Sequence, residues 1–271
     1  MTLRRGKIRR IVHVASAGIA LVLLAACKVD LSTTVTVAEN GSGSIVVVAR
    51  ADVAAVAAAP ELATSLNLDD LRAAGWEVDV VSPAADGGLT VTVSRAFANT
   101  DEATTFLSQL SGDSGPLRNL SLKRTGSTND ARYSLGGQAG LPQGLAGFAD
   151  SEALAVLGSA PFAASLATQG VSLDEALIMN FTVTMPGAEG ANNATSVLGA
   201  DDGVSTSFSW LIPVDQSELV LSASTRDRDL SAMLASYAAQ AFLVLMILLV
   251  AGAVMYIASV AYRRKSSTPT P

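Results

Sequence analysis

Short blocks of alternating apolar and polar residues recur along the chain, and turn residues separate them in pairs. Side chains on a strand alternate between its two faces, so alternation with a period of two predicts a strand. In the first block the positions on one face are Val29, Leu31, Thr33, Val35 and Val37. The sequence ENGSGS at 39–44 then supplies the Asn and Gly residues of a tight turn, and a second apolar block follows. We therefore expect a β-hairpin over 29–51.

Two more hairpins are expected on the same grounds, at 76–97 around Asp86-Gly87-Gly88 and at 116–137 around 126–129. Later apolar blocks predict single strands at 177–187, 204–214 and 218–225. The segment 188–203 is rich in Gly, Ala and Asn, and its composition predicts a loop.

Helical segments are expected between the hairpins. The Ala-rich segment 54–75 contains Pro60 near a start or break and ends at Gly75. At 100–112, Thr100 is the expected N-cap, followed by acidic residues in the first turn. Gly and Pro divide 141–170 into short helical pieces. Hairpins alternating with helices favour an α+β fold, with one antiparallel sheet and helices packed on one of its faces.

The C-terminal region contains one long apolar segment. Residues 238–262 carry no charge. The segment is longer than the roughly 20 residues that a helix needs to span a bilayer. Tyr237 and Tyr262 bracket the segment, as interfacial aromatic residues do. The basic sequence RRK follows at 263–265, and the positive-inside rule places it in the cytoplasm. We expect a linker at 226–236, a transmembrane helix at 237–262 and a cytoplasmic tail at 263–271.

The N-terminus has the form of an export signal. Five cations precede a short apolar run, as in a secretory signal peptide. Leu24-Ala25-Ala26-Cys27 matches the bacterial lipobox, in which the cysteine thiol is joined to diacylglycerol and becomes the mature N-terminus. We expect a lipoprotein signal at 1–26, an acylated Cys27 and an extracytoplasmic domain at 27–225. An uncleaved signal anchor is the alternative, and general or twin-arginine export both remain open.

The charge of the exported region is strongly negative. Five of the 18 basic residues lie in the first ten positions and three at 263–265, so the region between them carries ten. All 24 acidic residues lie there, which gives a net charge of −14. Nucleic-acid binding requires Lys and Arg to neutralise phosphates, so we expect no nucleic-acid partner.

Few residue types that carry catalysis would remain in the mature domain. The single histidine, His13, lies in the signal, and the single cysteine would be acylated. This excludes a Ser-His-Asp or Cys-His site and the common zinc sites, so we expect no enzyme, metal or cofactor. The neighbouring carboxylates fit helix ends or solvated positions better than a cleft, with Ser172 and Glu175 forming a capping box. These pairs are Asp69-Asp70, Asp101-Glu102, Asp174-Glu175 and Asp201-Asp202.

A Ser-Lys site would require Lys28 or Lys123. Lys28 adjoins the lipid anchor, and Lys123 shares a strand face with Ser121, which a pair on a sheet surface explains equally well. The spacing of a calcium loop is absent around Asp201-Asp202.

Several short motifs, in this order, resemble the LppM-like lipoproteins, an actinobacterial envelope family. They are LAACKVDLSTTVTVAENGSGSIVVVA, LRAAGWEV, GGLTVTVSRAFANTDEA, FTVTMPG and TSFSW, followed by a membrane helix. The Gly-rich segment 141–170 departs from the family pattern. The resemblance implies an extracytoplasmic α+β domain without recognised catalytic residues, and a role in envelope lipids or host contact.

Together these features predict a membrane-anchored, non-enzymatic envelope lipoprotein that binds an amphipathic ligand such as a lipid or glycolipid. Trp76 and Trp210 are candidates for lining its pocket, although large aromatics on strands are by default core residues. The alternative is a scaffold that binds other envelope proteins through a sheet edge or the segment 188–203. An apolar cavity of about 300 Å³ or more between sheet and helices would favour the lipid binder. The ligand, the oligomeric state and any protein partner are left open.

Overall fold

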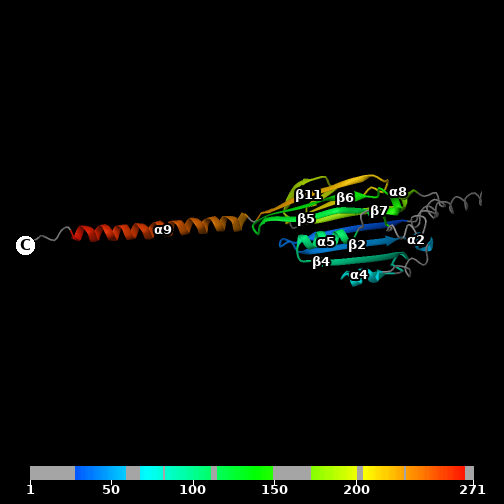
Figure 1. Cartoon of the computed structure of the whole chain (residues 1–271), viewed down its shortest axis with the longest axis horizontal. Helices are drawn as coiled ribbons and strands as arrows, with labels where there is room; N and C mark the ends of the chain where they lie inside the picture. Colours follow the sequence, from blue (N-terminus) through cyan, green and yellow to red (C-terminus); the bar gives the residue numbers. More distant parts are fainter. Residues whose placement is uncertain are drawn as a thin grey trace, which may run out of the picture. The chain divides into compact units, whose positions relative to one another are not determined.

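The computed structural model describes residues 28–58, 68–81, 83–110, 115–148, 172–199, 204–228 and 230–265. The chain divides into two units, Met1–Asp227 and Arg228–Pro271. The first contains two β-sheets with short helices, and the second is built on one long helix (Figure 1). The expected signal at 1–26 and Cys27 lie outside the described residues.

The larger sheet has seven strands, with β1 at its centre. In spatial order they are β3 (Glu77–Val81), β4 (Leu89–Phe97), β2 (Gly43–Ala51), β1 (Val29–Val37), β7 (Leu177–Pro186), β10 (Ser205–Leu211) and β9 (Ser196–Gly199). Neighbouring strands are antiparallel except β1 and β7, which run parallel with Val29 opposite Leu177. The α+β class and the hairpins β1–β2 and β3–β4 are confirmed.

The remaining strands form a second sheet, where a single sheet was expected. Its spatial order is β5 (Leu117–Ser127), β6 (Asp130–Gly140), β11 (Glu218–Arg228) and β8 (Ala188–Asn192). The third expected hairpin is confirmed, since β5 and β6 pair with Ser127 opposite Asp130. The prediction of one sheet was wrong because local pattern identifies hairpins but not how distant hairpins associate.

Two further expectations differ from the structure. The segment 188–203 was expected to be a loop, yet it contains β8 and β9, whose backbones pair with β11 and β10. Pairing with a partner strand outweighs a composition with low strand propensity. The segment 226–236, expected to be a linker, consists largely of secondary structure. Strand β11 continues to Arg228, and the C-terminal helix begins at Leu230.

The helices of the first unit are short. They are α2 (Val53–Ala58), α4 (Asp69–Ala73), α5 (Thr100–Gln109), the 3₁₀ helix η1 (Gly144–Phe148) and α8 (Leu173–Ala176). Most of the expected helical pieces of 141–170 lie outside the described residues. The N-cap of α5 is Asn99, not Thr100, because the Asn99 side chain accepts from the backbone N–H groups of Asp101 and Glu102. The capping box of Ser172 and Glu175 is confirmed.

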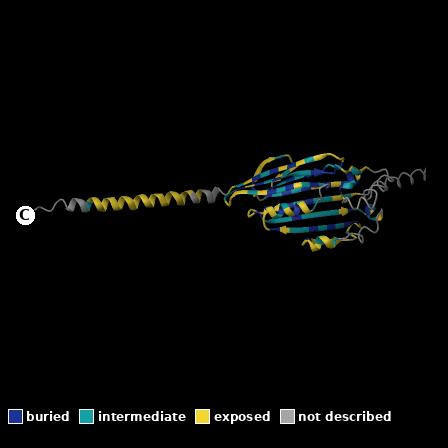
Figure 2. Ribbon diagram, viewed as in Figure 1, coloured by how far each residue is buried: buried dark blue, intermediate teal, exposed yellow. Residues whose placement is uncertain are grey.

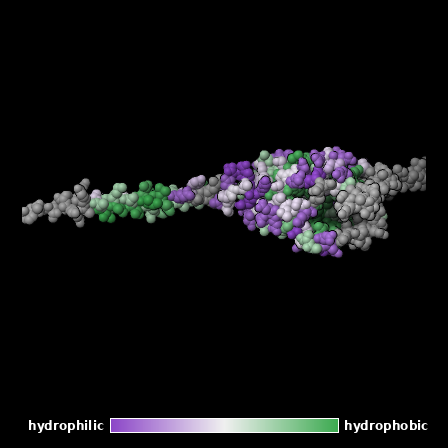
Figure 3. Space-filling view, in the orientation of Figure 1, coloured by the Kyte–Doolittle hydropathy of each residue, from purple (hydrophilic) through white to green (hydrophobic). Residues whose placement is uncertain are grey.

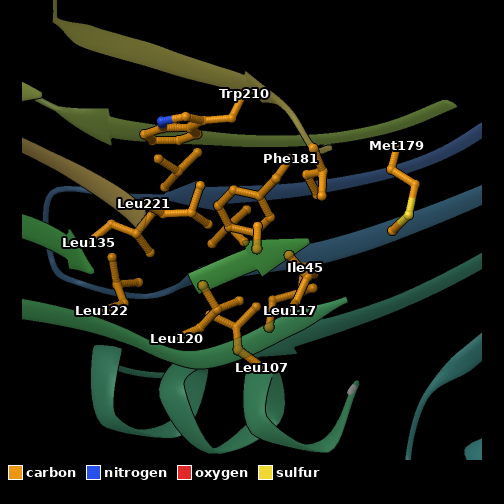
Figure 4. Close-up of a cluster of buried hydrophobic side chains, with 14 of the residues drawn as sticks. Ile45, Leu107, Leu117, Leu120, Leu122, Leu135, Met179, Phe181, Trp210 and Leu221 are labelled. Carbon is orange, nitrogen blue, oxygen red and sulfur yellow. The ribbon is translucent and has the colours of Figure 1, made fainter. Parts of the chain in front are cut away.

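The core lies between the inner faces of the two sheets and α5. Buried and exposed residues alternate along the strands (Figure 2), as expected for sheets with one covered face. Phe181 and Trp210, from adjacent strands, pack with ring centroids 6.0 Å apart. Figure 4 shows these rings above Leu120, Leu122 and Leu107, so both sheets and α5 contribute to one cluster.

Helix α5 also covers the edge of the second sheet. The backbone N–H of Leu122 in β5 donates to the Thr104 hydroxyl at 3.0 Å, and the same hydroxyl lies 3.1 Å from the Leu122 carbonyl. An unpaired strand edge invites association with other chains, and this contact occupies part of it. Thr104 therefore acts as a substitute for a neighbouring strand.

We expect Thr104→Val to lower the free energy of unfolding by about 1–3 kcal/mol, because it leaves the Leu122 N–H without its partner. Thr105→Val is the matched control, since the exposed Thr105 hydroxyl contacts only Asp101 of its own helix. It should cost less than about 0.5 kcal/mol. Urea unfolding of the two variants measures the difference, and equal stabilities would contradict the role given to Thr104.

The C-terminal helix α9 (Leu230–Lys265) is apolar along most of its length, as Figure 3 shows. Within its segment Tyr237–Val260, the most apolar stretch of 18 residues has a mean hydropathy of 2.7. At 1.5 Å per residue the 24 residues of the segment measure about 36 Å, enough to cross a hydrocarbon core of about 30 Å. By length and composition this helix could cross a membrane.

Candidate functional site

A partly open cavity of about 250 Å³ lies on the inner face of the larger sheet. Its floor is formed by β1, β2 and β7, and its walls by the C-terminal end of α5, the start of β5 and η1. The lining residues are Leu31, Thr33, Val47, Leu110, Gly115, Pro116, Leu117, Gly147, Phe148, Met179, Asn180 and Ile212. The volume is below the 300 Å³ that was expected of a lipid binder, and below the 300–1,000 Å³ typical of small-molecule sites.

The cavity exists because small residues meet at this point. Gly115 and Gly147 contribute no side chain to the wall, and Thr33 contributes only a short one to the floor. Elsewhere the same face of the larger sheet carries Val35, Phe181 and Trp210, which fill the space against the second sheet. Met179 stands apart from the other labelled core side chains in Figure 4, and it borders the cavity.

The lining is apolar and carries no charged side chain among the described residues. Its polar side chain is the hydroxyl of Thr33, because Asn180 is exposed between the buried Met179 and Phe181 and its side chain belongs to the outer face of the sheet. An apolar wall with few polar groups suits a hydrocarbon chain, and the polar groups can orient one end of a ligand.

The two tryptophans lie elsewhere. Trp210 is 1% exposed, and its Nε1 donates to the Asn193 side chain at 3.1 Å. Trp76 is buried against Phe106. Neither borders the cavity, so both belong to the core and do not form a ligand site there.

A broader and more open hollow of about 410 Å³ lies at the other side of α5. It contains the carboxylates of Glu77 and Glu102 and the guanidinium of Arg95. Arg95 stacks on the Phe106 ring, 3.5 Å from its centroid, and donates to the Ala74 carbonyl at 2.5 Å. These contacts account for Arg95 as a packing residue, so we assign no ligand to this hollow.

The acidic pairs lie at helix ends. Asp69 forms an exposed ion pair with Arg72 at 3.0 Å in α4. Glu102 accepts from the backbone N–H of Ala98 at 2.6 Å, and Asp174 lies in the first turn of α8. No group of three or more His, Cys, Asp or Glu able to hold a metal occurs in the part of the chain that the structure describes, and Asp201-Asp202 lie outside it.

The two lysine candidates are not in the cavity either. Lys123 is exposed on β5, opposite Ser134, and Lys28 is held by backbone contacts with Asp52. Neither residue borders either hollow.

Polar groups gather at the opposite end of the domain from the cavity. Arg226 donates through Nε and Nη2 to the two carboxylate oxygens of Asp130 at 2.7 and 2.6 Å, which raises the pKa of Arg226. The buried Tyr133 hydroxyl donates to the Glu39 carbonyl at 2.5 Å and accepts from Arg124. Burial raises the pKa of Tyr133, and the Arg124 guanidinium acts in the opposite direction. Figure 3 shows hydrophilic side chains at this end.

The comparisons with known proteins find one similar fold. The folded domain of Mycobacterium tuberculosis LppM, solved by NMR, matches with a TM-score of 0.43 and 17% identity. The match covers 76% of this chain and 93% of that domain. No protein-family model matches the chain, and neither does any curated protein. The similarity concerns the fold alone.

Proposed function

We propose that this protein is a non-enzymatic, membrane-attached envelope lipoprotein that binds an apolar or amphipathic ligand in the cavity. An envelope lipid or glycolipid is the ligand class that we favour. The observation that carries the proposal is the cavity bordered by Leu31, Val47 and Met179, whose described lining residues carry no charge. Burial of hydrocarbon in such a site is favourable by about 25 cal/mol for each Å² removed from water.

The size of the cavity limits what it can hold. A volume of about 250 Å³ suits part of an acyl chain more than a whole lipid. The headgroup would then remain outside the cavity. A protein with such a site would present or sense a lipid that keeps its polar end accessible.

Membrane attachment is the second part of the proposal. The lipobox predicts acylation of Cys27, and the apolar helix α9 supplies a span. The basic sequence at 263–265 supports a cytoplasmic C-terminus and a domain on the extracytoplasmic side. An acyl group and a span together attach the chain far more firmly than a single acyl chain does.

Native mass spectrometry of the full chain, purified from membranes of a lipid-containing host, tests ligand binding. We expect one lipid for each chain to survive removal of detergent. A chain that retains no lipid, and takes up none from extracted envelope lipids, would contradict the proposal.

A scaffold remains the second candidate, and the edges of the larger sheet favour it. Strand β9, from the segment 188–203, forms one edge and exposes Leu198. Strand β3 forms the other edge. Such edges can accept a strand from a partner protein. Binding of a protein partner that survives substitution of the cavity lining would favour this candidate.

A further inference from the structure

The chain enters and leaves the domain at opposite ends of β7. At entry, Val29 of β1 is paired with Leu177, the first residue of β7. At exit, the backbone of Arg226 and Asp227 lies against Gly187, directly after the last residue of β7. Between the two points, β7 itself spans nine residue steps of about 3.3 Å from Leu177 to Pro186, a distance of about 30 Å.

The entry point is fixed in place. The backbone N–H of Lys28 donates to the Asp52 carboxylate at 3.0 Å, and the backbone N–H of Asp52 donates to the Lys28 carbonyl at 3.0 Å. A group attached to the residue before Lys28 therefore starts from this end of the domain, which we call the Lys28 end.

The Lys28 end carries both the cavity and exposed apolar side chains. The cavity is bordered here by Leu31 and Met179, which pair with each other two residues along from Val29 and Leu177. Ile212, also in the lining, donates its backbone N–H to the Met179 carbonyl. Exposed apolar residues on several different elements surround this end, and they are Val53, Val81, Phe148, Ile178 and Leu211. Apolar side chains gathered at one end of a domain can insert at a membrane interface.

The connection to the span limits the other end of the domain. Ten residue steps join Asp227 to Tyr237, where the candidate span begins. Even fully extended, they reach about 35 Å. The span thus keeps the exit end near the bilayer, but it leaves the Lys28 end free to stand about 30 Å farther away.

We propose that the Lys28 end docks on the bilayer surface, so that the strands lie along the membrane and the cavity meets the lipid. The inference rests on the proposed function, because acylated Cys27 supplies the attachment at this end. Retention in the membrane does not explain why the chain has an acyl group in addition to a span, whereas docking of the Lys28 end does. The span holds one end of the domain, and the acyl group brings the cavity to the membrane.

Fluorescence quenching in vesicles tests this docking. A thiol-reactive fluorophore is placed at Leu211→Cys or Val53→Cys in the full chain, where acylated Cys27 has no free thiol. The vesicles contain phosphatidylcholine and phosphatidylglycerol with brominated acyl chains, which quench only fluorophores at the membrane. We expect strong quenching at both positions.

The matched control replaces residues 1–27 with a signal that is cleaved without acylation, so that the mature chain begins at Lys28. Quenching should fall severalfold in this control. Unquenched label in the acylated chain, or equal quenching in both chains, would overturn the docking. Intact mass decides acylation separately, and a Cys27 without an acyl group would refute the anchor. Lipid retention, measured by native mass spectrometry, is independent of the quenching and of the intact mass. Failure of ligand binding is therefore distinguishable from failure of docking.

Discussion

Gly187→Ala should strongly destabilise the domain. Gly187 has a φ of +92°, a conformation that alanine adopts only with strain. An added Cβ would also lie 2.4 Å from the backbone carbon of Arg226 and nitrogen of Asp227. Neither backbone atom can move without disturbing β11, which pairs with β8 directly after Gly187. We expect a loss of about 3 kcal/mol or more, from strain and overpacking together.

Gly136→Ala is the matched control for this prediction. Gly136 lies within β6, and nothing lies within 4 Å of the position of its added Cβ. The control should change stability by less than about 1 kcal/mol. Chemical unfolding of both variants, followed by tryptophan fluorescence, measures the difference. Similar midpoints for the two variants would mean that β7 and β11 do not approach each other as described.

Val47→Phe should abolish most of the ligand binding while leaving the fold intact. The Val47 side chain borders the cavity from β2, on one side of the floor, and is paired with Thr33 of β1. A phenyl ring at this position would occupy the space that we assign to an acyl chain. Filling an existing cavity should not cost the strain that overpacking a solid core does. Lipid retained in native mass spectra should fall at least tenfold relative to the wild-type chain.

Val46→Phe is the control for ring size, strand propensity and hydrophobicity. Val46 is the adjacent residue of β2 and points to the outer face of the same sheet, opposite Thr34. Its substitution should leave lipid retention unchanged. Equal loss in both variants would indicate a general effect on the sheet, and equal retention would place the ligand outside the cavity.

The local structure of this chain is largely predictable from its pattern, and the reasons are visible in particular elements. The period of two in 29–37 and the turn residues at 39–44 specify the β1–β2 hairpin. The parallel pairing of β1 with β7 joins residues about 150 positions apart, and no local signal specifies it. The second sheet and the strand character of 188–203 depend on the same kind of distant pairing. Asn99 and Thr100 are both able to cap a helix, and only the backbone path selects Asn99.

The candidate site was less predictable than the fold. Leu31, Thr33 and Val47 are recognisable as inward positions of their strands. Whether an inward position meets a filled core or a cavity depends on what lies opposite, and here Gly115 and Gly147 lie opposite. The tryptophans attracted attention because of their size, yet size also makes them the residues that fill the core. The signal for a cavity would have been small residues, such as Gly115 and Gly147, in segments that pack against the inward face of a distant strand.

Photo-crosslinking tests the central claim, that the cavity holds the hydrocarbon of a lipid, most directly. The full chain is incubated in vesicles with a lipid that carries a diazirine near the end of its acyl chain. After irradiation, mass spectrometry of peptides maps the crosslinks. We predict crosslinks to residues that border the cavity, above all Leu31, Val47 and Met179, in addition to those in α9. Crosslinks confined to α9 would contradict the account.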